Sequence, residues 1–154
     1  GVVGDNLWLW RADHEVPSNE GVTDSRNEVF HGLEVNGDDV IMYGLFCEHS
    51  LRDQTVWNGE NGKTFFYQCE LPYDVTQANF GDLGYAGYAV GAHVASHSLE
   101  GAGVYSYCRD YDVHVRSGFK APGVRLHHAN LFTVFLNGKG GIDSVLDGRG
   151  PSSS

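Results

Sequence analysis

The sequence contains an internal repeat of 22 residues, and few folds are compatible with a repeat of this length. The segments LEVNGDDVIMYGLFCEHS (33–50) and TVWNGENGKTFFYQCELP (55–72) align without a gap. Four identical pairs share the same separation: Asn36 and Asn58, Gly37 and Gly59, Cys47 and Cys69, and Glu48 and Glu70. Leucine-rich solenoids and parallel β-helices both have such periods, because each winds one supersecondary unit per turn.

The pattern inside each repeat favours the β-helix over the leucine-rich solenoid. The leucine-rich consensus is missing, and each unit carries apolar runs such as VIMYGLF and TFFYQC between polar Gly/Asn corners. No window shows a 3.6-residue apolar stripe between helix caps, and 21 glycines argue against a helical bundle. We therefore predict an all-β parallel β-helix, a solenoid, over residues 1–148.

Three segments are expected to depart from regular coils. The stretch 71–87 is rich in glycine and turn residues, so we interpret it as a loop insertion that could form part of a cleft wall. Short strands separated by glycine are expected to resume after it, and the tail at 149–154 is expected to be disordered. Because the chain opens on strand-like GVVGDNLWLW without an initiator Met, we expect a processed or truncated product.

Charge and composition narrow the class of partner. A formal net charge of −10 produces long-range repulsion from nucleic acid and from anionic membrane surfaces. No apolar run approaches the roughly 20 residues that span a bilayer. The three Trp, eight Tyr and eight Phe offer flat faces that pack on sugars as well as fill a core. We therefore expect neither a nucleic-acid nor a membrane partner, and a neutral substrate fits better.

Glu48 and Glu70 are the candidate catalytic residues. In a parallel β-helix, residues one coil apart stack at about 4.8 Å, so both carboxyls cannot ionise cheaply. One of them should hold a proton near neutral pH, as a general acid must. The alternative is a pair of solvated glutamates without a function. Nearby aromatic residues, among them Phe46, Phe66 and Tyr73, and the cost of stacking like charges favour the functional pair.

The cysteines occupy the opposite phase of the same strands. Cys47 and Cys69 should therefore point into the coil if the glutamates point out. Their expected separation leaves a disulfide and a ladder of buried thiols equally open.

The histidines and aspartates do not predict a metal site. His93 and His97 would lie about 13 Å apart on a strand, and the adjacent His127 and His128 would face opposite ways. Four aspartates considered for calcium fit turns better: Asp38, Asp39, Asp143 and Asp147. We expect no metal and no cofactor.

Four segments resemble the carboxy-terminal half of the glycoside hydrolase family 55 exo-β-1,3-glucanases: DNLWLWRADHE (5–15), VNGDDVIMYGLFCEHS (35–50), WNGENGKTFFYQCELPYD (57–74) and GVRLHHANLFTVFLNGKGGIDSVLDG (123–148). The resemblance covers most of the chain, from about residue 4 to 148. It implies part of a larger tandem of right-handed β-helices, in a secreted polypeptide. It also implies an enzyme that releases glucose from laminarin-type β-1,3-glucan with inversion.

The same resemblance implies roles for individual residues. Glu70 corresponds to the general acid and Glu48 to the acidic residue beside it, while Tyr73 and either Trp8 or Trp10 correspond to sugar-binding aromatics. A stacked pair about 5 Å apart would by itself indicate a retaining enzyme. We therefore expect Glu48 to tune the pKa of Glu70 while a water held elsewhere attacks the sugar.

The resemblance also implies a partner. Residues that position the attacking water come from the amino-terminal half of the family, so we expect an amino-terminal companion β-helix polypeptide beside the β-1,3-glucan. The choice between the two tryptophans depends on the variable loop from 15 to 32. The alternatives are a non-catalytic, lectin-like β-helix that keeps the aromatic cleft, and a structural β-helix such as an adhesin segment.

Overall fold

The computed structural model describes residues 1–14 and 26–154, so residues 15–25 of the variable loop lie outside the described residues. The elements follow one another as β1 (Val3–Trp10), β2 (Leu33–Val35), β3 (Ile41–Glu48), β4 (Thr55–Trp57), β5 (Gly62–Glu70), the π-helical turn η1 (Gln77–Gly81), β6 (Tyr88–Val90), β7 (Ser96–Val115), β8 (Phe119–Lys120) and β9 (Arg125–Ile142).

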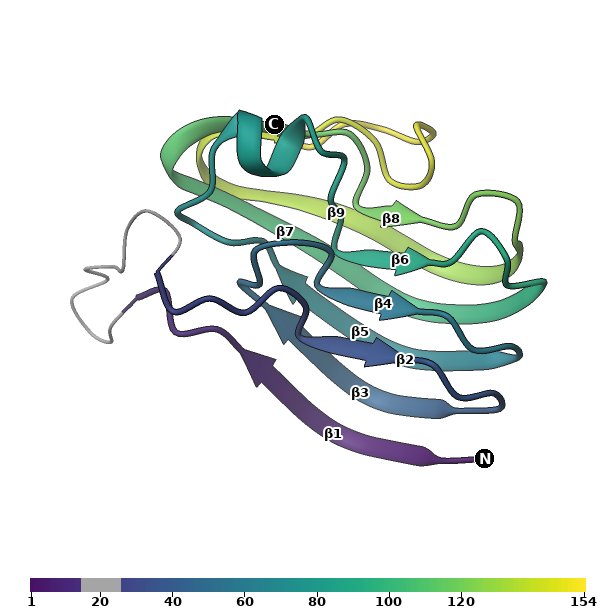
Figure 1. Cartoon of the computed structure of the whole chain (residues 1–154). Coiled ribbons are helices and arrows are strands. Elements are labelled where there is room, and N and C mark those ends of the chain that lie inside the picture. The colour runs from purple at the N-terminus through teal and green to yellow at the C-terminus, as the bar shows by residue number, and fades with distance from the viewer. Residues whose placement is uncertain (15–25) are drawn as a thin grey trace.

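These strands form two sheets in which every strand pair is parallel (Figure 1). One sheet has the order β1-β3-β5-β7-β9, and the other has the order β2-β4-β6-β8. The chain therefore alternates between the sheets, and each strand of the first sheet is followed by a short strand or a turn leading to the second. The prediction of an all-β fold with parallel strands is confirmed.

The strand register follows the sequence repeat. Phe46 pairs with Gln68 between β3 and β5, and Leu33 pairs with Thr55 between β2 and β4, both at the repeat separation of 22 residues. At one corner the side-chain amide of Asn58 donates to the side-chain oxygen of Asn36 at 2.9 Å. Repeated asparagines therefore stabilise stacked turns, while β3 and β5 stack in a single register.

A column of residues with left-handed backbone conformation crosses the first sheet at one level. Five residues of positive φ lie in it: Asn6, Gly44, Phe66, Gly101 and Asn130. The pairing of neighbouring strands skips each of them. Consequently Thr64 and Tyr67 of β5 are both buried although they are three residues apart. Strict alternation from Thr64 would point Glu70 inward, so the left-handed conformation of Phe66 is what turns this carboxyl to the outer face.

The core lies between the sheets. Its largest members are apolar or aromatic and come from both layers: Leu45, Tyr67, Leu99, Trp57, Tyr88 and Phe119. Cys47 and Cys69 are completely buried and are free thiols. The inward orientation predicted for these two cysteines is confirmed, and of the two possibilities left open the structure contains buried thiols.

The last third of the chain differs from the sequence-based expectation. β7 and β9 are continuous strands of 20 and 18 residues, where glycine corners were expected. Gly101 has a φ of +66° but does not end the strand, because the residues on either side of it, Glu100 and Ala102, pair in register with Ala129 and Leu131 of β9. The tail expected to be disordered is also partly paired, since Ser153 and Ile142 exchange two backbone hydrogen bonds of 2.9 Å.

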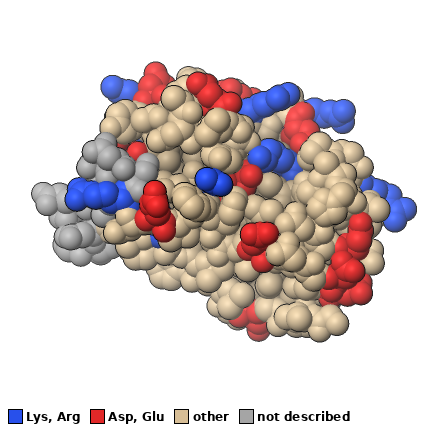
Figure 2. Space-filling model, viewed as in Figure 1, with Lys and Arg blue, Asp and Glu red and all other residues tan. Residues whose placement is uncertain are grey.

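Residues 71–87 join β5 to β6 and contain η1. A capping box begins this turn: Asn79 N–H donates to Thr76 Oγ1 at 3.2 Å, and Thr76 N–H donates to Asn79 Oδ1 at 2.7 Å. Among the described residues, no helix is long and apolar enough to cross a bilayer. Figure 2 shows acidic side chains scattered over the visible face, between broad stretches without charge.

Candidate active site

The two candidate glutamates end adjacent strands on the outer face of the first sheet. Glu48 is the last residue of β3 and Glu70 is the last residue of β5. Immediately after Glu48, the backbone N–H of His49 donates to the carbonyl oxygen of Glu70 at 2.9 Å. The repeat thus brings both carboxyls to the same end of neighbouring strands.

Glu48 is the more enclosed carboxyl. Its residue is 6% exposed, and both of its oxygens accept hydrogen bonds. The indole Nε1–H of Trp8 donates to Oε2 at 2.6 Å, and the amide of Gln68 donates to Oε1 at 2.8 Å. Burial raises the pKa of Glu48 and the charge of Glu70 adds to this, although the Trp8 hydrogen bond and the neighbouring histidines oppose it. The pKa of the Glu48 carboxyl is therefore above its ordinary value.

Glu70 is held by the loop that follows it. The hydroxyl of Tyr73 donates a short hydrogen bond to Glu70 Oε1, and His49 Nε2 lies 4.0 Å from Oε2. Tyr73 is only 7% exposed, and its ring packs against His14, His49 and Tyr107. Burial, followed by the contact with Glu70, raises the pKa of Tyr73 far above its ordinary value. Tyr73 is consequently a fixed hydrogen-bond donor, and its ring is mostly enclosed by protein.

Trp8 and Trp10 form the exposed aromatic surface beside the carboxyls. They are 65% and 40% exposed, and their rings stack at 6.1 Å with an interplanar angle of 27°. A hollow of about 400 Å³ lies next to them, lined by Asn6, Leu7, Trp8, Gly44, Phe46, Glu48 and Gln68. Trp8 borders this hollow, whereas Trp10 makes an edge contact with His14. Aromatic walls with a carboxylate and two amides suit a hydroxyl-rich ligand.

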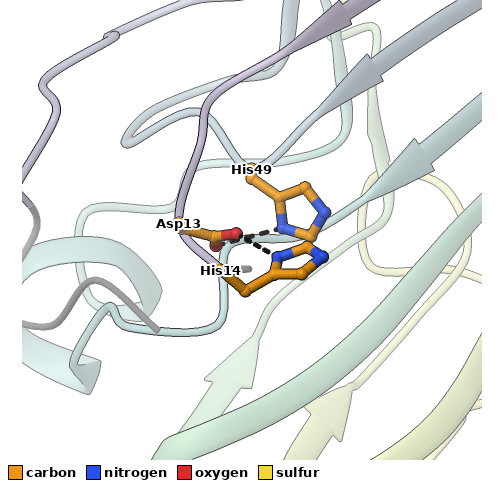
Figure 3. A group of neighbouring side chains, drawn as sticks. All are labelled: Asp13, His14 and His49. Carbon is orange, nitrogen blue, oxygen red and sulfur yellow. Dashed lines mark hydrogen bonds and ion pairs between the residues drawn. The ribbon is translucent and has the colours of Figure 1, made fainter. Parts of the chain in front are cut away.

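A buried polar network behind the carboxyls was missed by sequence reasoning. Asp13 lies at its centre, completely buried, with Oδ1 2.7 Å from His14 Nδ1 and Oδ2 3.1 Å from His49 Nδ1 (Figure 3). The backbone N–H of Tyr73 also donates to Asp13 Oδ2 at 3.2 Å. Burial by itself would raise the pKa of Asp13, but the contacts with His49, His14 and Tyr73 outweigh it and lower the pKa.

Arg11 extends this network to the loop after β5. Its guanidinium is completely buried, forms a short ion pair with Asp74 and lies 3.4 Å from Asp13. The available sequence signal was the polar run Arg-Ala-Asp-His directly after the apolar strand β1. The sequence signal for His49 was weaker: a histidine follows Glu48, whereas a leucine follows Glu70 at the same place in the repeat. The buried charges join the ends of β1, β3 and β5.

The same cluster offers the donor types that bind metals. Donor atoms of Asp13, His14 and His49 all lie within 4.8 Å of one another, as in no other group of the described residues. Both oxygens of Asp13 already contact the two imidazoles. A hydrogen bond to His14 and an ion-pair contact with His49 account for the cluster, and we assign no ion to it.

The histidines considered in the sequence lie apart. His97 is buried in β7, with Nε2 2.8 Å from the hydroxyl of Tyr88, whereas His93 lies before that strand and contacts the carbonyl of Asn58 at 3.0 Å. His127 and His128 are exposed on β9. None of these four lies in the network around Asp13.

The chain is similar to known proteins. Residues 1–70 match the family described as the LAM55 pectate lyase-like domain. Over 97% of its length, the chain is 42% identical to an exo-β-1,3-glucanase of Streptomyces sp. (strain SirexAA-E / ActE), of which it covers 25%. The resemblance to the family 55 glucanases that the sequence predicts is confirmed.

Solved structures agree with this relationship. The structure of sacteLam55A from Streptomyces sp. SirexAA-E superposes on 99% of the chain with a TM-score of 0.83 and 38% identity. A glutamate-to-alanine variant of sacteLam55A, in complex with glucose, superposes with a TM-score of 0.84. The chain covers 28% of each of these structures, so it spans about a quarter of the length of its relatives.

Proposed function

From its relationship to the LAM55 exo-β-1,3-glucanases, we propose that this chain is part of a secreted glycoside hydrolase that releases glucose from β-1,3-glucan. The curated relative is named for that activity, and one solved neighbour holds glucose. The observation that carries the proposal is the arrangement of Glu48 and Glu70 at the ends of adjacent strands, beside two exposed tryptophans.

In the proposed mechanism, Glu70 is the general acid. Its proton passes to the glycosidic oxygen as the bond to the anomeric carbon breaks, and the leaving sugar departs as an alcohol. A water then adds to the opposite face of the oxocarbenium-like centre and loses its proton to a base, which gives inversion. The hydrogen bond from Tyr73 orients Glu70, while Glu48 lies close enough to couple to it electrostatically.

Trp8 and Trp10 supply the proposed sugar platform. Both are exposed, and Trp8 forms a wall of the hollow that Glu48 lines. A pyranose ring places its C–H face on an aromatic surface and directs its hydroxyls to carboxylates and amides. Of the two residues that the sequence could not separate, Trp8 is the better candidate for direct stacking, because it is more exposed and borders the hollow.

We propose further that the fold is a right-handed parallel β-helix and that it belongs to a larger tandem of such helices. The alternation of strands between two parallel sheets is the arrangement that such a coil requires. The relatives are about four times as long as this chain, which leaves room for an amino-terminal companion that supplies the residues holding the attacking water. The remainder of the site is thus assigned to that companion.

Glucose release from laminarin tests the proposal. The assay uses this chain together with its companion polypeptide, and compares the parent with Glu70→Gln. We expect the substitution to lower kcat by at least about 100-fold, because a general acid contributes that much. Glu100→Gln is the matched control, since Glu100 is an exposed glutamate on the next strand, beside Phe65 and away from the carboxyl pair.

Two outcomes of this assay count against the glucanase proposal. If Glu70→Gln keeps the activity of the parent, Glu70 is not the general acid. Binding of laminari-oligosaccharides without turnover, in a sample shown to contain the full assembly, would favour the lectin-like alternative.

A further inference from the structure

Gln68 interrupts an otherwise apolar row on the outer face of the first sheet. Strand pairing aligns Trp8 with Phe46, Phe46 with Gln68, and Gln68 with Gly103. In the sequence repeat, Gln68 therefore occupies the place that phenylalanine has one coil earlier. The repeat changes from an aromatic ring to an amide at the position that faces Glu48.

The contacts of this amide complete the hydrogen bonding of Glu48. Gln68 Nε2 donates to Oε1 at 2.8 Å, opposite the indole of Trp8, which donates to Oε2 at 2.6 Å. An indole N–H can only donate, and the amide nitrogen of glutamine can only donate. Two donors on two oxygens favour the ionised carboxylate, and they fix its plane because each oxygen is held from a different strand.

We propose that Gln68 is a positioning residue which, together with Trp8, clamps Glu48 as an unprotonated acceptor facing the hollow. Its catalytic consequence rests on the proposed function: Glu48 is kept from serving as the acid, so proton donation falls to Glu70. The clamp opposes the burial that raises the pKa of Glu48, a residue that is only 6% exposed.

The indole resonance of Trp8 provides a direct test on this chain. In a nitrogen–proton NMR correlation spectrum, the Nε1–H signal of Trp8 should titrate with Glu48. The Trp8→Phe variant assigns the signal, and Glu48→Gln abolishes its titration. In Gln68→Met, which keeps the length of the side chain but removes the donor, we expect the midpoint to move up by about one pH unit, the value of one hydrogen bond.

Controls separate positioning from general effects on the fold. Lys63→Met changes another outward residue of β5 that is exposed and remote from Glu48, and its midpoint should equal that of the parent. If Gln68→Met does not fold, Gln68→Asn gives the same measurement with an amide one methylene too short. An unchanged midpoint in a folded Gln68 variant would overturn the proposal.

Laminarin hydrolysis is measured separately on the assembled protein. A shifted midpoint without hydrolysis supports the clamp and rejects the glucanase proposal. Hydrolysis with an unshifted midpoint rejects the clamp alone.

Discussion

The hydroxyl of Tyr73 donates a hydrogen bond to Oε1 of Glu70, while the ring of Tyr73 is enclosed by the buried network. The loop after β5 therefore returns to the carboxyl at the end of β5. Because the pKa of Tyr73 is far above its ordinary value, the hydroxyl stays protonated at every pH at which the fold operates. The geometry of Glu70 depends on this donor and leads to the first prediction.

Replacing Tyr73 by phenylalanine removes the donor and keeps the ring. A hydrogen bond to a charged group contributes about 1.5–3 kcal/mol, so kcat on laminarin should fall about 10- to 100-fold while the thermal midpoint changes little. Tyr43→Phe, which removes an exposed hydroxyl elsewhere on the outer face, serves as the control. A kcat within twofold of the parent in Tyr73→Phe would show that the bond does not position the acid.

The raised pKa of Glu48 makes the stability of the fold depend on pH. The folded state keeps this proton to a higher pH than the unfolded state, whose ordinary value is 4.5, so stability is lost as pH rises through that window. As the pH rises from 4.5 toward neutrality, the parent should lose stability relative to Glu48→Gln. Thermal unfolding of both proteins across this range measures the difference, and a constant difference would contradict the prediction.

His97 should have the opposite pH dependence. Burial lowers its pKa from 6.5 to about 4, so the unfolded state takes up a proton first as the pH falls. Stability is therefore present above pH 6.5 and lost toward about pH 4, by about 3 kcal/mol for a shift of this size. His97→Gln keeps a polar partner for Tyr88 and should remove this loss, as urea unfolding at both pH values will show. An equal loss of stability between pH 6.5 and about pH 4 in the two proteins would contradict this role of His97.

Phe66 is a strained position in the column of residues with positive φ. Its φ is +61° and its side chain is 73% exposed, so it adopts an unfavourable backbone conformation with little burial in return. Asparagine already occupies the same column at Asn6 and Asn130. Phe66→Asn should relieve about 1 kcal/mol of strain and raise the thermal midpoint by about 2–4 °C.

The control for this prediction is Phe46→Asn. Phe46 is also exposed on the outer face but lies outside the positive-φ column, so asparagine should not stabilise the fold there. An equal rise of the thermal midpoint in both variants would attribute the effect to the loss of an exposed apolar side chain. An unchanged midpoint in Phe66→Asn would show that Phe66 is not strained.

Local periodicity made much of the site accessible to prediction. The spacing of Glu48 and Glu70 equals one sequence repeat, so their arrangement on neighbouring strands follows from the repeat. The phase of the pleat likewise predicts Cys47 and Cys69 inside. Neither inference needs any contact beyond the next strand, because stacking in a parallel sheet is set by the number of residues in each coil.

Contacts between non-repeating segments were not accessible in this way. Asp13 meets His49 and Tyr73 only because three strands end side by side, and no spacing in the chain encodes this meeting. The continuous strands β7 and β9 depend on each other, since the pairing on both sides of Gly101 continues the ladder through this glycine.

From the sequence alone follow the all-β class, the repeat length and the two carboxyls on adjacent strands, since these depend on chain periodicity. The tertiary structure decided that the left-handed conformation of Phe66 turns Glu70 outward and that Trp8 and Gln68 hold Glu48. It also decided that Glu48 has a raised pKa. Hydrogen bonds and burial depend on distances between atoms of different strands, and these distances exist only after the coils have stacked.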